Sequence, residues 1–150
     1  MATTVNNTTV NTRLTIIFDS EGNLDGNGPA KGSGNTESDV YLDDKVCHNL
    51  RSHTEIDVSV HALQWDAANN NGHIEYTDSR DNTTLTELPS WVTNVVIRVE
   101  AEDKYTEAYN TAYDADASAG TDDDTAAVTA GTNAGVAARN SYLSGNSITY

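Results

Sequence analysis

The sequence predicts a mainly β protein, an antiparallel β-sandwich or small barrel with extended polar arms at both ends. Several segments between residues 12 and 103 alternate apolar and polar side chains, as strands with one buried face do. Turn-forming glycine and asparagine separate these segments, whereas small and polar residues dominate both ends. We therefore expect an N-terminal arm at 1–11, a β domain at 12–113 and a C-terminal arm at 114–150.

The first expected strand runs from Thr12 to Asp19, with Leu14, Ile16 and Phe18 on one face. A glycine-rich connection at 20–35 follows, too irregular to continue the strand. The mixed spacing of apolar residues in 38–51 predicts a short strand followed by a turn.

Residues 54–77 read as a β-hairpin. In the segment 54–65, Ile56, Val58, Val60 and Ala62 alternate with polar residues. The dipeptide Asn71-Gly72 is a strong turn signal, and 73–77 then returns as the partner strand.

The segment 94–103 alternates around Val95, Ile97 and Val99, which predicts another strand. Tyrosines recur every four residues through 104–115, a period that fits a helix or a strand. Because no breaker precedes this stretch, we expect the strand to continue. In the C-terminal arm, 126–143 could form a small-residue helix, broken near Gly131 and Gly135, which would need a surface to lie against.

The composition argues against several classes of partner. The chain carries 8 basic and 23 acidic residues, a net charge of −15. Such a chain repels phosphate backbones and anionic lipid surfaces, so we expect neither nucleic acid nor membrane as partner. No apolar run is long enough to span a bilayer, and residues 1–7 lack the features of a signal peptide. Cys47 is the single cysteine, which rules out an internal disulfide framework.

One stretch comes close to a metal-binding motif. Oxygen-bearing side chains alternate from 19 to 27 and are followed by Gly28, as in the first half of an EF-hand loop. When Asn23 is taken as the first position of such a loop, the twelfth should be glutamate but is Gly34, so a true EF-hand is not expected. A looser calcium site remains an alternative to a polar turn that ends the strand. Its candidate ligands are Asp19, Glu21, Asn23, Asp25 and Asn27.

No other residues form a recognisable catalytic or cofactor motif, and we expect the protein not to be an enzyme. His61 and His73 could face each other across the hairpin, although such histidines more commonly pair with carboxylates such as Glu75. His48, His53 and Cys47 show no metal-ligand spacing. Trp65 and Trp91 could stack on a sugar, but core or interface packing is the commoner role.

The leading functional hypothesis is a non-enzymatic structural subunit of a larger assembly. Arms with little core of their own are stabilised when they pack against another subunit, so we expect a homo-oligomer or other assembly partners. In composition and architecture the chain resembles virion proteins of marine bacteriophages, such as capsid decoration, tail or fibre-associated subunits. That resemblance implies a place on the virion exterior. The alternative is a calcium-dependent carbohydrate-binding or adhesion module built on the 19–28 loop.

Overall fold

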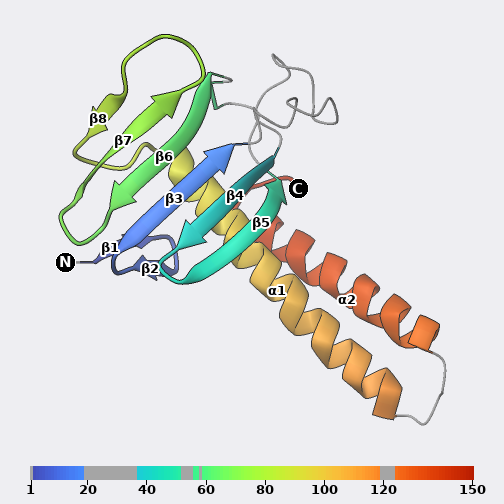
Figure 1. Cartoon of the computed structure of the whole chain (residues 1–150). Coiled ribbons are helices and arrows are strands. Elements are labelled where there is room, and N and C mark those ends of the chain that lie inside the picture. The colour runs from blue at the N-terminus through green and yellow to red at the C-terminus, as the bar shows by residue number, and fades with distance from the viewer. Residues whose placement is uncertain (1, 19–36, 52–55, 58, 119–123) are drawn as a thin grey trace. The chain divides into compact units, whose positions relative to one another are not determined.

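The computed structural model describes residues 2–18, 37–51, 56–57, 59–118 and 124–150 (Figure 1). The chain forms two compact units, Met1–Val96 and Ile97–Tyr150. All strands of the described residues lie in the first unit. The second unit is a helical hairpin, and its first helix begins within the first unit. The expected limits of arms and domain, 1–11, 12–113 and 114–150, remain a prediction.

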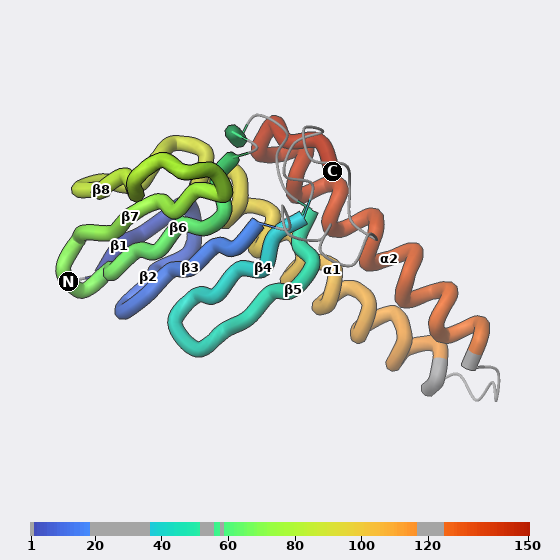
Figure 2. Tube along the Cα trace, turned by 45° about the horizontal axis from the view of Figure 1, so that its top comes forward, coloured from blue at the N-terminus to red at the C-terminus, as the bar shows by residue number. Residues whose placement is uncertain are grey.

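The first unit is built on a six-stranded antiparallel sheet of order β5-β4-β3-β6-β7-β8. Figure 2 shows β3 and β6 at its centre, with β4 and β5 on one side and β7 and β8 on the other. The antiparallel β prediction is therefore confirmed, but a sandwich or barrel is not, because the sheet is open. The strands are β3 (Arg13–Phe18), β4 (Glu37–Leu42), β5 (Lys45–Arg51), β6 (Val60–Asp66), β7 (Asn71–Tyr76) and β8 (Thr83–Leu85).

One face of this sheet carries the core. Leu14, Ile16 and Phe18 of β3 are fully buried on the same face, as their alternation predicted. Register places Trp65 and Leu63 of β6 beside Leu14 and Ile16. The Phe18 ring packs against the Trp91 ring at 5.6 Å between centroids. Trp65 is 3% exposed, so the core role is confirmed for this tryptophan.

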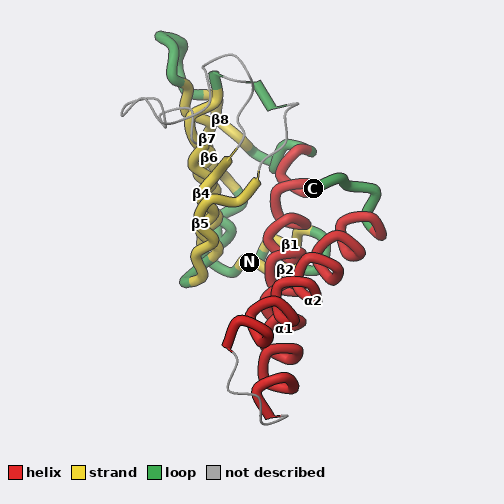
Figure 3. Tube along the Cα trace, turned by 90° about the vertical axis from the view of Figure 1, so that its right-hand side faces the viewer, coloured by secondary structure: helices red, strands yellow, loops and turns green. Residues whose placement is uncertain are grey.

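The N-terminal segment forms a two-stranded hairpin of β1 (Thr3–Val5) and β2 (Thr8–Val10). Figure 3 shows this hairpin beside the edge-on sheet. Val5 and Val10 are buried, and Trp65 Nε1 donates a hydrogen bond to Thr3 Oγ1 at 3.0 Å. The segment expected as an arm thus contributes to the core of the first unit.

The Asp43 carboxylate fastens the link between β2 and β3. It accepts hydrogen bonds from the backbone N–H groups of Asn11, Thr12 and Arg13 at 2.7–3.2 Å, and from Thr12 Oγ1 at 2.8 Å. These donors, first the Asn11 amide and then that of Thr12, hold the pKa of Asp43 far below its usual value. Asp43 also has a positive φ of 53° in the turn between β4 and β5, a conformation that aspartate tolerates.

Three local strand predictions were wrong in detail. The strand expected at 54–65 begins only at Val60, where β6 starts, and the described residues Ile56, Asp57 and Ser59 before it are not in a strand. Residues 38–51 form two paired strands, β4 and β5, rather than one strand and a turn. Asn71-Gly72 is not the turn of the β6–β7 hairpin, because Gly72 lies within β7 opposite Trp65. A Cβ at Gly72 would overlap the Gln64 carbonyl oxygen and come within 3.0 Å of the Trp65 ring, so glycine is required there by close approach.

The larger correction concerns 94–103 and 104–115, which are not strands. Both lie in one helix, α1 (Trp91–Ser118). The β-branched residues favour a strand locally, yet Val92, Val95, Val96 and Val99 also have the i, i+3, i+4, i+7 spacing of a helix. All four are at most 1% exposed. Burial of this stripe decided for the helix over the intrinsic preference of valine.

Candidate functional site

The predicted calcium ligands Asp19, Glu21, Asn23, Asp25 and Asn27 lie outside the described residues, so that site remains a prediction. Within the described part of the chain, no group of three or more His, Cys, Asp or Glu side chains could hold a metal ion. In the same part, no helix is long and apolar enough to cross a bilayer.

The histidines do not come together as the hairpin suggested. Register places Gln64, not His61, opposite His73, and His73 Nε2 lies 3.5 Å from Glu75 Oε2. His48 Nδ1 lies at the same distance from Asp39 Oδ1. Both pairs are on exposed strand faces and are of the histidine–carboxylate kind that was expected. His53 lies outside the described residues.

The second unit carries a groove between its two helices, and the packing of these helices determines its shape. α2 (Asp124–Gly145) confirms the predicted C-terminal helix, but without the expected breaks at Gly131 and Gly135. Each glycine instead lies under a tyrosine ring of α1. A Cβ at Gly135 would come within 2.8 Å of the Tyr105 ring, and one at Gly131 within 2.8 Å of the Tyr109 ring.

Tyrosines form a ladder along α1. The rings of Tyr105, Tyr109 and Tyr113 stack in sequence, with centroids 6.2 and 6.0 Å apart and an interplanar angle of 16° in each pair. Tyr105 packs on Gly135, and Tyr109, four residues later in α1, packs on Gly131, four residues earlier in α2. Large rings on α1 thus pack on glycines of α2, a large-against-small arrangement that allows the helices to approach closely.

The C-terminal end of α2 is closed by a Schellman motif. Ile148 N–H donates to Leu143 O at 2.9 Å and Ser147 N–H donates to Ser144 O at 3.0 Å. Ser147 takes the left-handed conformation with φ of 60°, and Ile148 packs on the cluster of Ile97, Ala101 and Leu143. The last residues are held further by Arg98, whose Nη2 donates to Thr149 O at 2.8 Å.

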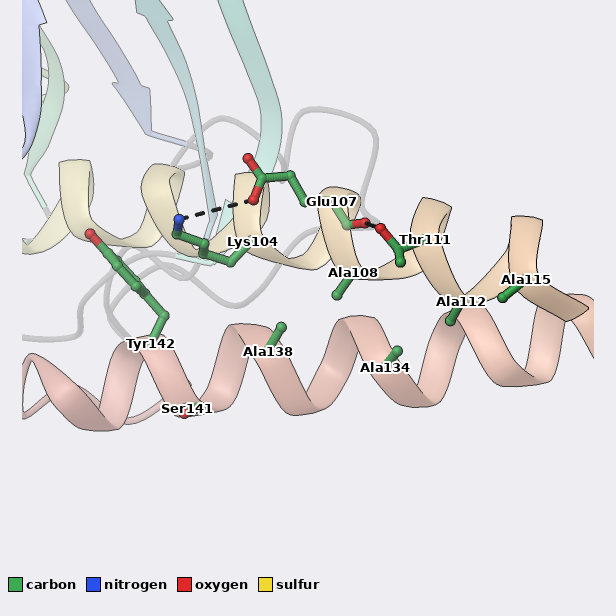
Figure 4. Close-up of a pocket in the computed structure, with 10 residues that line it drawn as sticks. All are labelled: Lys104, Glu107, Ala108, Thr111, Ala112, Ala115, Ala134, Ala138, Ser141 and Tyr142. Atoms are coloured by element: carbon green, nitrogen blue, oxygen red, sulfur yellow. Dashed lines mark hydrogen bonds and ion pairs between the residues drawn. The ribbon is translucent and has the colours of Figure 1, made fainter.

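A groove of about 680 Å³ runs along one flank of the hairpin, and we call it the alanine groove. Figure 4 shows its alanines directed between the two helices. Most of these alanines are half-buried, and Ala115 is exposed. The lining residues are Lys104, Glu107, Ala108, Thr111, Ala112 and Ala115 of α1, with Ala134, Ala138, Ser141 and Tyr142 of α2.

Lys104 and Tyr142 lie toward one end of the groove, and Thr111 lies further along it among the alanines (Figure 4). Lys104 Nζ lies 4.0 Å from Glu107 Oε2 and 5.9 Å from the centroid of the Tyr142 ring. Tyr142 Oη donates to the buried Glu100 carboxylate at 3.0 Å. Thr111 Oγ1 donates to the backbone carbonyl of Glu107 at 2.9 Å and is thereby satisfied within its own helix. Apart from the Ser141 hydroxyl, the remaining lining is alanine methyl groups, which offer packing rather than acid–base chemistry.

No protein-family model, curated protein or solved structure matches this chain. The alanine groove was not anticipated from the sequence. The signal was present in Ala108 and Ala112, which follow the tyrosine spacing, but it is readable only when 104–115 is taken as a helix.

Proposed function

We propose that the chain is a non-enzymatic structural subunit of a larger assembly, and that it associates through the helical hairpin. The observation that carries this proposal is the alanine groove. It has an open apolar floor and an ion pair at one end, which is the character of a surface for helix packing rather than of a catalytic pocket. Small side chains let a further helix approach the hairpin closely.

We further propose a bacteriophage virion as that assembly, with the subunit in a capsid decoration or in a tail or fibre. The support is compositional: a chain of net charge −15 suits an exterior position better than contact with a packaged genome. The alternative, a calcium-dependent carbohydrate-binding or adhesion module, depends on the 19–28 loop.

Size-exclusion chromatography with light scattering, run with calcium and with chelator, separates these proposals. A structural subunit predicts a defined oligomer whose mass is the same in both buffers. A monomer in both would refute self-assembly. A monomer whose melting temperature rises with calcium would favour the adhesion module and make the loop at 19–28 a binding site.

A further inference from the structure

A small polar pocket lies on the face of the six-stranded sheet opposite the core. Its volume is about 200 Å³, and five polar side chains of β3, β6 and β7 line it: Arg13, Gln64, Asp66, Asn71 and His73. Register places Asp66 between Arg13 and Asn71, and it places Gln64 beside His73. Side chains two residues apart in a strand point to the same side, so all five share one face. We call this feature the sheet pocket.

The Arg13 guanidinium lacks its expected cross-strand partner. Opposite charges that face each other on antiparallel strands ordinarily attract, and Arg13 lies opposite Asp66. The Asp66 carboxylate instead accepts hydrogen bonds from the backbone N–H groups of Ala68 and Asn69 at 3.0 and 3.1 Å, and from Asn69 Nδ2 at 2.8 Å. Within the described part of the chain, the guanidinium makes no hydrogen bond or ion pair and acts on Asp66 only through its charge. Its N–H donors therefore remain available to a ligand.

Thr15 orients the Gln64 amide beside the pocket. Thr15 Oγ1 donates to Gln64 Oε1 at 2.9 Å, which turns Nε2 toward β7, where its contact with Glu75 Oε2 is long, 3.5 Å. His73 Nε2 lies 3.5 Å from the same oxygen. When the neutral ring carries its proton on Nε2, its Nδ1 is an acceptor. Polar groups that are oriented in advance lose less entropy when a ligand binds.

The charges and the polar groups together select the class of ligand. Asp66, Glu75 and the net charge of −15 oppose a bound anion, whereas Arg13 opposes a bound cation. The lining offers donors on Arg13 and Gln64 together with acceptors on Asp66 and His73. A hydroxyl group donates and accepts at once, so a neutral polyhydroxy ligand satisfies both kinds of group. The volume of about 200 Å³ is below the roughly 300–1,000 Å³ of sites for drug-sized ligands, and therefore suits one sugar ring.

We infer that the sheet pocket binds one neutral sugar unit of a glycan, without calcium. The contacts are hydrogen bonds rather than ring stacking, because Trp65, the aromatic residue of β6 beside the pocket, is 3% exposed. A few such bonds correspond to a dissociation constant of about 1 mM for a single sugar. This inference goes beyond the proposed function, and multivalency connects the two. An assembly that presents many copies of a millimolar site attaches far more tightly to a glycan surface than one copy does.

NMR titration of the amide groups with the methyl glycosides of glucose, galactose and mannose tests the pocket. We expect at least one glycoside to shift the backbone amides of Gly72 and His73 and the side-chain amide of Gln64, with a saturable dependence on concentration. Arg13→Gln should raise the dissociation constant about tenfold, because it removes hydrogen bonds from a charged donor. The control Arg51→Gln makes the same change on β5, outside the lining, and should leave binding unchanged. Both positions are exposed, and circular dichroism checks that each variant is folded.

Charged sugars test the ligand class. Glucuronate and glucosamine should bind more weakly than glucose, and stronger binding of either would overturn the neutral ligand. The pocket is also overturned if no neutral glycoside shifts these amides at about 50 mM, far above the expected dissociation constant, or if Arg13→Gln and Arg51→Gln weaken binding equally. Loss of binding in chelator would overturn it as well and favour the calcium-dependent module. In each of these cases the assembly role keeps its own test, the mass of the oligomer.

Discussion

Substituting Gly135 by alanine puts two opposing effects in direct competition. In a helix interior, Gly→Ala ordinarily stabilises by about 1 kcal/mol, because alanine loses less backbone entropy. At this position, however, the new methyl would lie 2.8 Å from two atoms of the Tyr105 ring and 3.0 Å from a third. Ordinary carbon–carbon contacts are about 3.5–4.0 Å, so the helices must separate by roughly 1 Å at this level.

Overpacking of this size costs about 1–3 kcal/mol. We therefore expect Gly135→Ala to lower the free energy of unfolding by up to about 2 kcal/mol, once the helix-propensity gain of about 1 kcal/mol is subtracted. Gly145→Ala is the matched control, because a Cβ there meets nothing within 4 Å. It should be neutral or slightly stabilising. Urea unfolding followed by circular dichroism at 222 nm measures both variants.

A double-mutant cycle assigns the cost to the ring. In a Tyr105→Ala background the methyl at 135 has no ring to meet, so Gly135→Ala should become stabilising there. The reasoning is refuted if Gly135→Ala is as stable as Gly145→Ala in the unmodified chain. It is also refuted if the cost of Gly135→Ala persists without the tyrosine.

Two further predictions concern the turn at Asp43 and the end of α2. Asp43→Asn keeps the side-chain shape and the tolerance for positive φ, but it removes the charge that accepts hydrogen bonds from the amides of Asn11 and Thr12. We expect the free energy of unfolding at pH 7 to fall by about 1–2 kcal/mol, after discounting for solvent screening. The control Asp44→Asn, at the exposed neighbouring position, should change it little. The fold lowers the pKa of Asp43. Its contribution to the free energy of unfolding is therefore complete above the unfolded pKa of about 4 and is lost as pH falls below that value. Chemical unfolding should show the unmodified protein and Asp43→Asn converging in stability in acid, and a difference that persists there would contradict the charge argument. Ser147→Gly should raise the free energy of unfolding by about 0.5–1 kcal/mol, because glycine adopts the φ of 60° seen at this position without strain. Thermal unfolding compares this variant with the control Ser144→Gly, which lies inside the helix. A loss of stability in Ser147→Gly would count against the Schellman motif.

Several elements were determined by sequence alone because their patterns are local. The alternation of Leu14, Ile16 and Phe18 fits only a strand with one buried face, and β3 has that face. The pairing of β6 with β7 was also predicted, as was a helix between 126 and 143 that required a supporting surface. For β3 the period of the apolar residues allowed one assignment, whereas the hairpin was predicted in part from a turn signal at Asn71-Gly72 that lies within β7, and the helix from its small residues.

Tertiary structure decided where the local signal was ambiguous. Tyr105, Tyr109 and Tyr113 repeat every four residues, which suits either element, and only packing on Gly131 and Gly135 of a distant segment selects the helix. Those glycines were expected to break α2 because helix propensity reflects their backbone entropy alone. It does not include the tyrosine rings of α1, which occupy the space that a Cβ at either position would fill. The hydrogen bonds of Asp43 to residues about thirty positions away are likewise absent from any local pattern. The alanine groove exists only once both helices are paired, since its two walls come from segments that the sequence keeps apart.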